Sequence, residues 1–315
     1  PDYYADIPIV REGIARKYSN IEALDKEVGI LLDALEADGV MENSVIFFWS
    51  DHGGNLLRQK RAVGDSGLHV PLIIRYPDGY RAGETESRMV SLMDLGPTVL
   101  SLTGQKPPKY MDGKAFAGPF EEAPRDYIYG SADRFDESTD MQRSVLDGRY
   151  VYIKNFMPEL PLIYRNRYRE QIPMNKHLIE LDAEGKLEGD AAYIFMKTKP
   201  QEELYDLKND PYEVHNLAND PAHAEKLKEM STQLSQWQSA IQDRGFTPES
   251  EIIREFWPGM IQPVTADVKI QQQNNTIVLS CATEGASIGY QLSDAIGSDY
   301  WQLYTKPLLL QPQEK

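Results

Sequence analysis

The residues of this chain best suited to chemistry stand together at Asp51 and His52, directly before Gly53 and Gly54. A carboxylate and an imidazole side by side can share a cation, and two glycines let the backbone turn sharply and approach an ion closely. Calcium prefers carboxylate oxygens, whereas zinc more often takes imidazole nitrogens, so the pair by itself leaves the metal open. An isolated Asp-His-Gly sequence is more often a strand-end turn in which the Asp caps a backbone amide. The interpretation as a metal site therefore depends on the surrounding sequence.

Two predicted elements precede this pair and must position it. Apolar residues between positions 18 and 37 recur three and four apart, which predicts an amphipathic helix whose apolar face packs on a sheet. These residues are Ile21, Leu24, Val28, Leu31, Leu32 and Leu35. Residues 45–49 combine β-branched and aromatic side chains, which predicts a buried strand. Asp51 would then stand at the carboxyl end of that strand, where ligands bind in open α/β sheets.

The rest of the pattern extends this α/β interpretation. A second apolar run at 70–74 predicts another inner strand, and residues 93–102 predict a short helix. Further along, short alternating strands predict a small antiparallel sheet, in which Asp147 and Gly148 form a hairpin turn. The helical spacing of apolar residues at 221–242 predicts a helix that closes the main domain.

Composition narrows the classes of partner. The 315 residues include 33 Lys and Arg against 49 Asp and Glu, for a formal net charge of −16, so we expect no nucleic-acid partner. An acidic protein that binds an anion must concentrate positive charge or a metal ion locally. No apolar run approaches the roughly 20 residues that cross a bilayer, so no membrane span is expected. One cysteine, Cys281, excludes a disulfide framework within the chain.

The composition changes towards the C-terminus. Residues 246–263 are rich in Pro, Gly and bulky side chains without a period, and the residues after them shift to Gln, Asn, Thr and short strands. We therefore predict a boundary near residue 260. The predicted divisions are 1–125, an α/β part; 126–260, an antiparallel subdomain; and 261–315, a β-rich module.

Several motifs in a fixed order resemble the type I sulfatase family of the alkaline phosphatase superfamily. They are the Ser-Asp-His-Gly sequence at 50–53 and the segments 58–60, 66–75, 94–98, 112–114, 203–207, 210–213 and 216–217. Each motif alone is weak, and their order is specific. The resemblance covers residues 1 to about 250 and corresponds to the C-terminal part of the sulfatase domain. It implies an alkaline phosphatase-like sheet with helices on both faces, followed by a small antiparallel subdomain.

The resemblance also implies a metal site and a substrate contact. In this family one calcium ion binds the sulfate group, and Asp51 and His52 occupy the position of its later pair of ligands; the remaining ligands lie upstream of this chain. Lys60 stands where the family has a lysine that contacts a sulfate oxygen, with Arg58 as a basic neighbour. Fixed cations there stabilise charge that develops during reaction. The plainer alternative for Lys60 is a solvated loop lysine, and that alternative suits Arg61 better.

Two further arginines are candidates for substrate contacts. Arg134 and Arg143 lie in stretches that resemble the segment between the domain cores of bacterial polysaccharide sulfatases. The planar guanidinium group matches carboxylate and sulfate oxygens two at a time. Arg134 has acidic neighbours on both sides, so an internal ion pair explains it equally well.

The nucleophile expected from the resemblance is absent from the sequence. The family converts a Cys or Ser in a Cys/Ser-x-Pro-x-Arg motif to formylglycine, and no such motif occurs here. Cys281 lacks the Pro and the Arg, so we interpret it as a small core residue. We therefore expect the chain to be a fragment of a longer enzyme, inactive by itself, with the formylglycine in the missing segment.

The C-terminal module resembles the small β-sandwich appended to some chitobiases and hexosaminidases, and it stops before the last strand would finish. The expected activity of the parent enzyme is hydrolysis of sulfate esters on a sulfated polysaccharide or glycosaminoglycan, in the periplasm or outside the cell. Two alternatives stay open. One is a phosphodiesterase or phosphonate hydrolase of the same superfamily, and the other is a catalytically inactive carbohydrate-binding protein.

Overall fold

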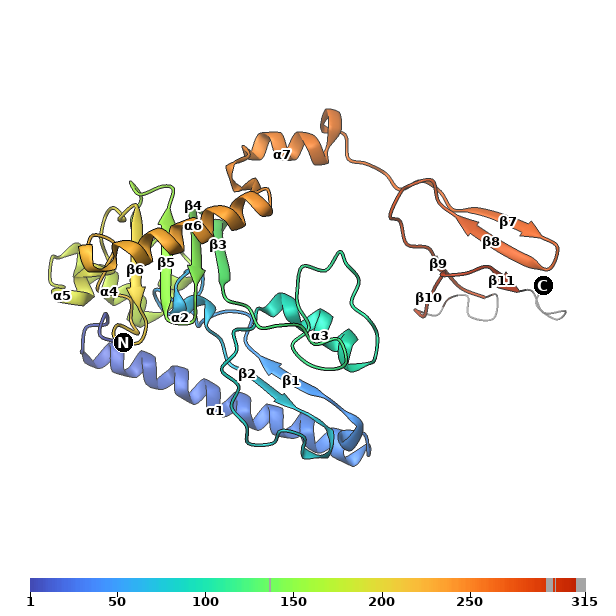
Figure 1. Cartoon of the computed structure of the whole chain (residues 1–315), viewed down its shortest axis with the longest axis horizontal. Helices are drawn as coiled ribbons and strands as arrows, with labels where there is room; N and C mark the ends of the chain where they lie inside the picture. Colours follow the sequence, from blue (N-terminus) through green and yellow to red (C-terminus); the bar gives the residue numbers. More distant parts are fainter. Residues whose placement is uncertain (136, 293–296, 298, 310–315) are drawn as a thin grey trace. The chain divides into compact units, whose positions relative to one another are not determined.

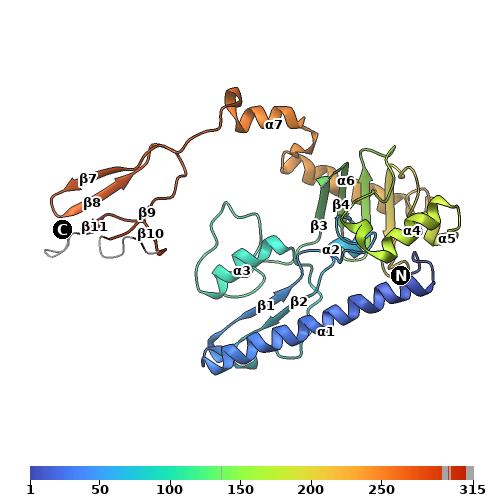
Figure 2. The same cartoon turned by 180° about the vertical axis from the view of Figure 1, so that it is seen from behind.

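The computed structural model of the chain describes residues 1–135, 137–292, 297 and 299–309. The chain divides into two compact units, Pro1–Gly245 and Phe246–Lys315, and we describe each by itself. The predicted divisions at 125 and 260 stay predictions. Figures 1 and 2 show the elements from opposite sides.

The described helices include seven α-helices and seven short 3-10 helices. The α-helices are α1 (Pro8–Ala37), α2 (Asp65–Leu68), α3 (Leu95–Leu102), α4 (Pro173–Ala183), α5 (Gly189–Tyr193), α6 (Ala224–Ala240) and α7 (Glu249–Phe256). The 3-10 helices are η1 (Met41–Asn43), η2 (Pro77–Gly79), η3 (Leu92–Asp94), η4 (Arg169–Gln171), η5 (Pro221–His223), η6 (Arg244–Phe246) and η7 (Pro258–Met260).

The strands form a mixed α/β fold with these helices, as the sequence predicts. In the first unit they are β1 (Ile46–Trp49), β2 (Leu72–Arg75), β3 (Ile128–Phe135), β4 (Ser138–Leu146), β5 (Tyr150–Asn155) and β6 (Glu202–Asp206). In the second unit they are β7 (Lys269–Gln273), β8 (Thr276–Ser280), β9 (Gly289–Tyr290), β10 (Gln302–Leu303) and β11 (Leu308–Leu309).

The predicted antiparallel sheet is confirmed, with the strand order β3-β4-β5-β6. Its β4–β5 hairpin turns at the predicted Asp-Gly pair: the carboxylate of Asp147 accepts from the backbone N–H of Arg149 at 2.9 Å and of Tyr150 at 2.7 Å. Gly148 follows with φ +91°, a left-handed conformation that favours glycine. The turn thereby sets the register of β4 and β5.

Both faces of this sheet are covered. Helix α6 packs on one face, as Figure 1 shows, and its Met230 and Leu234 join a fully buried cluster with side chains of β4, β5 and β6. The other face packs against the loop after β1 through Val63, which contacts Val151 and Tyr205. Burying a large apolar side chain contributes roughly 1.5–3 kcal/mol, so Val63 helps to hold the loop after β1, which we call the site loop, on the sheet.

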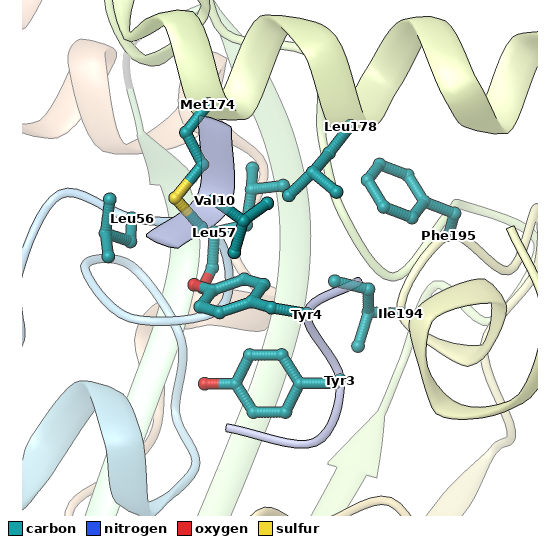
Figure 3. Packing of buried hydrophobic residues seen from close by; sticks show 9 residues of the cluster. All are labelled: Tyr3, Tyr4, Val10, Leu56, Leu57, Met174, Leu178, Ile194 and Phe195. Atoms are coloured by element: carbon teal, nitrogen blue, oxygen red, sulfur yellow. The ribbon is translucent and has the colours of Figure 1, made fainter. Parts of the chain in front are cut away.

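The start of the chain packs against the same loop. Figure 3 shows Tyr4 and Val10 beside Met174 and Leu178 of α4, with Leu57 between them. The hydroxyl group of Tyr4 donates to the backbone carbonyl of Leu57 at 2.6 Å. The first turns of α1 are therefore anchored in a core that also holds the site loop.

The strand pair β1–β2 differs from the prediction. The two strands are antiparallel, with Phe48 opposite Ile73, and they form a two-stranded ribbon. The predicted strands are confirmed, but their predicted burial is wrong, because Trp49 is 44% exposed and Ile73 is 62% exposed. No third strand pairs with the ribbon within the described residues, so its side chains lack the neighbours that would cover them.

The apolar stripe of α1 is also uncovered over much of its length. The helix begins at Pro8, ten residues before its predicted start. Ile21 is 52% exposed and Leu31 is 66% exposed, so the prediction that this stripe packs on a sheet is wrong for these residues. In both views α1 lies alongside the β1–β2 ribbon (Figures 1 and 2).

The second unit is β-rich, as predicted. Strands β7, β8 and β11 form a three-stranded antiparallel sheet, and β9 pairs with β10. The predicted sandwich module also includes residues 293–296, 298 and 310–315, which lie outside the described residues. Across the part of the chain that is described, no helix is long and apolar enough to cross a membrane.

Candidate functional site

The loop after β1 presents Asp51 and His52 because the two following glycines allow close backbone contacts. The backbone N–H of Gly53 donates to the carbonyl oxygen of Gly67 at 2.9 Å. A Cβ atom on Gly53 would lie 2.3 Å from the carbonyl oxygen of Ser66, so no larger residue fits without movement of the loop. The backbone at Gly53 thus packs closely against residues 66–67, which only a glycine allows without movement of the loop.

The side chains of Asp51 and His52 face each other. Nδ1 of His52 lies 2.7 Å from the carbonyl oxygen of Gly53, and Nε2 lies 3.4 Å from Oδ2 of Asp51. A proton on Nδ1 that is donated to Gly53 leaves the lone pair of Nε2 directed to the same region as the carboxylate. Two acceptors that converge in this way suit a shared cation. A protonated imidazole would instead form an ion pair with Asp51.

This pair can supply only part of a metal coordination shell. The side chain of Asp51 is 79% exposed and that of His52 is 38% exposed, so both are open to further ligands. Within residues 1–135, 137–292, 297 and 299–309, no group of three or more His, Cys, Asp or Glu side chains is placed to hold a metal ion. Calcium takes six to eight oxygen ligands. The residues fit a cation site that needs ligands from elsewhere.

Lys60 lies in the same loop as the pair. Its backbone N–H donates to the carbonyl oxygen of Gly54 at 2.8 Å, which closes the loop back towards Asp51 and His52. The side chain of Lys60 is half-buried. The structure thus brings the three predicted residues onto one loop, and their roles toward calcium and sulfate stay predictions.

Lys17 is a residue of this site that the sequence interpretation missed. Its Nζ donates to Oε1 of Gln59 at 2.9 Å, and a Cβ atom on Gly54 would lie 2.8 Å from that Nζ. Burial lowers the pKa of Lys17. The residue stands inside α1, whereas the predicted helix started one residue after it. A predicted helix that began at Pro8 would have included Lys17.

The side chain of Arg58 is buried in the protein. Its Nη1 donates to the carbonyl oxygen of Tyr212 at 2.6 Å, and its Nη2 donates to that of Glu213 at 2.6 Å. The guanidinium also lies over the ring of Tyr3, 5.4 Å from its centroid. These contacts join the site loop to the segment after β6. The buried guanidinium group of Arg58 is thus engaged by the protein. A contact between Arg58 and the substrate stays a prediction.

Glu213 completes this joint. Its Oε1 accepts from the backbone N–H of Asp65 at 2.9 Å, at the first turn of α2. Burial raises the pKa of Glu213 to about 7, against the opposing charge of Arg58, whose Nη2 lies 3.7 Å from the carboxylate. The loop that carries the candidate site is therefore held by a hydrogen bond to a carboxyl group whose pKa is about 7.

Arg143 is the most deeply buried of the predicted arginines, with 1% of its side chain exposed. Its Nε and Nη2 donate to the carboxylate of Asp243 at 2.7 and 2.8 Å, and its Nη1 donates to Asp133 at 2.9 Å. The hydrogen bonds from Arg143 lower the pKa of Asp243 to about 2. Arg143 holds β4 to the end of the α6 segment, and a contact with substrate stays a prediction.

Arg134 is exposed near the end of β3. The next residue, Phe135, lies under the guanidinium of Arg61, whose Cζ is 4.6 Å from the ring centroid. This contact places the end of β3 against the loop that carries Lys60. Of the two arginines predicted from the polysaccharide-sulfatase stretch, Arg134 is the exposed one.

Positive charge near Lys60 is greater than the sequence interpretation allowed. Arg61 is half-buried on Phe135, so its interpretation as a solvated loop residue is wrong. Arg169 is buried close by, and its Nη2 donates to the carbonyl oxygen of Tyr164 at 3.0 Å. Burial, together with the charge of Arg61, lowers the pKa of Arg169. Two neighbouring desolvated guanidinium groups favour an anion at this side of the loop.

Known proteins with similar sequences include several sulfatases. A sequence profile described as Sulfatase matches residues 4–105. The chain is 44% identical over 310 residues to an Ulvan-active sulfatase of Formosa agariphila, a match that takes in 98% of this chain and 52% of the relative. It is 25% identical over 279 residues to the N-sulphoglucosamine sulphohydrolase of Homo sapiens, which takes in 84% of this chain and 55% of the relative. The chain spans about half the length of these relatives.

Solved structures with the same fold include BT4656, which was determined in complex with its substrate D-glucosamine-2-N,6-O-disulfate. The TM-score is 0.52 at 22% identity, over 72% of this chain and 41% of BT4656. This likeness supports the alkaline phosphatase-like fold, and the sequence matches carry the assignment to a family. Residues 4–105 therefore match the sulfatase family, and the chain is similar to a sulfatase along nearly its whole length.

Proposed function

We propose that this chain is part of a sulfatase that hydrolyses sulfate esters on a sulfated carbohydrate. The observation that carries the proposal is the convergence of Oδ2 of Asp51 and Nε2 of His52, 3.4 Å apart, on the loop that also holds Lys60. A shared cation and a fixed ammonium group suit a sulfate group, which presents several anionic oxygens. The similarity to an Ulvan-active sulfatase supports a sulfated polysaccharide as the substrate.

The proposed metal is calcium. The Asp51 carboxylate is a hard oxygen ligand, and the open position of both side chains leaves room for the additional oxygen ligands that calcium requires. We propose that these ligands come from sulfatase sequence outside the 315 residues. Bound calcium would polarise the sulfate group and stabilise charge on its oxygens.

Each basic residue of the loop has a proposed role. Lys60 binds a sulfate oxygen, while Lys17 positions the loop through Gln59. Arg134, exposed where β3 meets the loop, contacts the carbohydrate or a second anionic group. A formylglycine hydrate is the proposed nucleophile, supplied by the same outside sequence as the missing calcium ligands. A polymeric sulfated substrate suits a periplasmic or extracellular enzyme, which is the proposed location.

The decisive experiment compares Asp51→Asn with Asp78→Asn in the protein as its gene encodes it. Free sulfate released from ulvan and from a glycosaminoglycan is measured with calcium and with chelator. We expect Asp51→Asn to lower kcat by about 10²-fold or more, because it weakens the cation site, and Asp78→Asn to leave kcat unchanged. Asp78 is the matched control because its backbone has φ +56°, which Asn tolerates, outside the site loop.

The same assay separates the alternatives. Turnover of phosphate diesters or phosphonates in preference to sulfate esters would favour the hydrolase alternative of the superfamily. Carbohydrate binding without release of sulfate would favour the inactive binding protein. Sulfate release that is insensitive to both chelator and Asp51→Asn would rule out the proposed metal site.

A further inference from the structure

A short stretch beside the site loop concentrates positive charge in an otherwise acidic protein. Residues 164–170 read Tyr-Arg-Asn-Arg-Tyr-Arg-Glu, with three arginines and one acid, whereas the whole chain has a formal net charge of −16. An acidic protein that binds an anion must collect positive charge locally. We call this stretch and its neighbours on the site loop and β3 the basic surface. Its members are Arg61, Phe135, Arg165, Arg167, Tyr168 and Arg169.

Hydrogen bonds hold residues 164–170 against the start of β4. The backbone N–H of Arg167 donates to Oε1 of Glu137 at 2.8 Å, and Oγ of Ser138 donates to the carbonyl oxygen of Arg165 at 3.3 Å. These bonds use backbone atoms of the two arginines and leave their guanidinium groups to other contacts. The guanidinium group of Arg165 pairs with Glu170 at 2.6 Å while its side chain stays 72% exposed, and Arg167 is exposed too. Both arginines are therefore accessible to a ligand.

The basic surface is continuous with the site loop. Phe135, at the end of β3, lies under the guanidinium group of Arg61, which directly follows Lys60 in the sequence. Arg61 also lies within electrostatic range of Tyr168. Arg169 lies close enough to Arg61 for their charges to interact, is 5% exposed, and has no hydrogen-bond partner for its Nε among the described residues. A ligand that brings an anionic group to Lys60 therefore meets further positive charge beside it.

Two aromatic side chains stand exposed among these arginines. Phe135 is 52% exposed and Tyr168 is 58% exposed. An aromatic ring offers an apolar face to the C–H groups of a sugar ring, and the hydroxyl group of a tyrosine can form hydrogen bonds at the same time. A neighbouring guanidinium group offers paired donors to a sulfate or carboxylate group. This combination fits an anionic sugar residue better than a free inorganic anion, which has no ring to pack.

The rest of the molecule favours a glycan over a nucleic acid, the other polyanion that stacks on aromatic rings. The formal net charge of −16 repels a long phosphate backbone, which binds through many cations at once. The basic surface is short and can match only one or two charged groups. A single anionic sugar residue beside Lys60 needs no more than that.

We propose that the basic surface binds an anionic sugar residue next to the one whose sulfate group lies at Lys60. Arg167 contacts the sulfate or carboxylate group of this neighbouring residue, and Tyr168 packs against its ring. Arg61 and Arg169 add positive charge. The enzyme thereby prefers a polymer to a single sugar. The inference rests on the proposed function for the identity of the ligand, and on the arginines and the exposed rings for its location.

The test measures binding by isothermal titration calorimetry to the protein as its gene encodes it, with chelator present to prevent turnover. The probes are dextran sulfate, polygalacturonate, uncharged dextran and single-stranded oligo(dT). We expect binding of at least one charged glycan and no binding of dextran. Arg167→Gln should weaken the binding about tenfold, through loss of charge-assisted hydrogen bonds, and Tyr168→Ala about fivefold, through loss of the ring.

The matched control is Arg254→Gln, which removes one exposed arginine from α7 in the second unit and should leave the affinity unchanged. Arg167→Lys keeps the positive charge and should retain most of the affinity. Circular dichroism checks that each variant keeps its fold, which is expected because the substituted residues are exposed.

The choice of probe identifies the bound group. Tighter binding of dextran sulfate would assign a sulfate group to the neighbouring sugar, and tighter binding of polygalacturonate would assign a carboxylate group. Equal binding of uncharged dextran, or no binding of either charged glycan, would overturn the proposal. Equal losses from Arg167→Gln and Arg254→Gln would overturn it too, because the affinity would then follow net charge alone. Tighter binding of oligo(dT) than of both charged glycans would replace the glycan by a nucleic acid.

Release of sulfate separates this inference from the proposed function. With ulvan as the substrate, Arg167→Gln should raise KM about tenfold, and the increase should be larger than with a sulfated monosaccharide. Glycan binding that the variants weaken, without release of sulfate by any form of the protein, would leave the basic surface established and the proposed function wrong. Release of sulfate from ulvan, with glycan binding unchanged in the variants, would do the reverse.

Discussion

The β3–β6 sheet and the β1–β2 ribbon are both built from apolar strands, yet only the sheet buries them. Val145, Tyr152 and Leu204 of the sheet are completely buried, whereas Trp49 and Ile73 of the ribbon are 44% and 62% exposed. The difference lies in the neighbours and not in the strands. The sheet has α6 on one face and the site loop on the other, and the ribbon has open edges within the described residues.

The two regions also differ in how they hold charge. The sheet region pairs its buried charges, as Arg143 does with Asp133 and Asp243. The end of the ribbon leaves the charge of Asp51 open to a ligand. Removing one partner of a buried ion pair leaves a buried charge uncompensated, whereas an exposed carboxylate stays accessible to a ligand. Stability should therefore be concentrated in the sheet, and sensitivity to ligands in the ribbon and its loop.

The largest expected effect is the loss of the buried ion pair. Arg143→Ala leaves the carboxylate of Asp243, which is 8% exposed, buried without its cation, so we expect the free energy of unfolding to fall by about 3–5 kcal/mol. Urea unfolding followed by circular dichroism measures it. Arg11→Ala is the matched control: Arg11 also pairs with an Asp through two hydrogen bonds, at 2.5 and 2.6 Å, but both side chains are 71% exposed. It should change the free energy of unfolding far less than Arg143→Ala does, and equal effects would mean that burial does not set the strength of the ion pair.

The next effect compares the two apolar regions directly. Leu234 of α6 is 1% exposed in the sheet core, so Leu234→Ala should lower the free energy of unfolding by about 2–5 kcal/mol through lost contacts and a cavity. Ile73→Ala removes a side chain that is mostly in water already, and we expect a change within about 0.5 kcal/mol. A large loss from Ile73→Ala in the isolated chain would show that the ribbon is covered in solution, which would contradict the comparison.

Glu213, at the joint between the two regions, gives a dependence on pH. Its pKa is about 7 in the folded protein and 4.5 without the fold, so the folded state keeps a proton that the unfolded state releases between these values. The free energy of unfolding should therefore fall as pH rises from about 4.5 to 7, by about 1–3 kcal/mol.

Glu213→Gln cannot ionise, so its stability should lack this fall and exceed that of the wild type at pH 7. The control is Glu42→Gln, since the side chain of Glu42 is 73% exposed in its pair with Arg75. Unfolding is measured at a series of pH values from 4 to 8. A wild-type profile that rises with pH across this interval would show that Arg58 keeps Glu213 ionised.

The sequence predicts local structure here better than contacts between distant residues. Hydrophobic periodicity locates α1 and α6, and the Asp147-Gly148 pair locates the β4–β5 turn, because these signals depend on neighbours along the chain. The sequence predicts the two strands of the ribbon correctly, but it does not predict that they are exposed. Composition reports the tendency to form a strand, whereas burial depends on what packs against it.

The same limit applies to the site. Asp51, His52 and Lys60 lie close in the sequence, and the loop that joins them was predictable. Arg58 has a partner 155 residues away in Glu213, and Arg143 has one 100 residues away in Asp243, so residue type alone did not reveal that the fold engages both guanidinium groups. A motif identifies a loop, and only the tertiary structure shows which of its cations are already engaged.

Lys17 provides the smallest and most local test of the comparison. Lys17→Met keeps the length of the side chain and the helix but removes the hydrogen bond of 2.9 Å to Gln59. That bond contributes about 1 kcal/mol, so the loop should open about fivefold more often, which hydrogen exchange at the amide of Lys60 reports through its bond to Gly54. Lys26→Met is the control, because Lys26 pairs with Glu22 on the exposed side of the same helix.

Faster exchange in the loop, with no change in the amides of β5, would show that α1 stabilises the ribbon end independently of the sheet. Faster exchange in both would mean that the site loop and the sheet open as one unit, and that the contrast between the two regions does not extend to their dynamics.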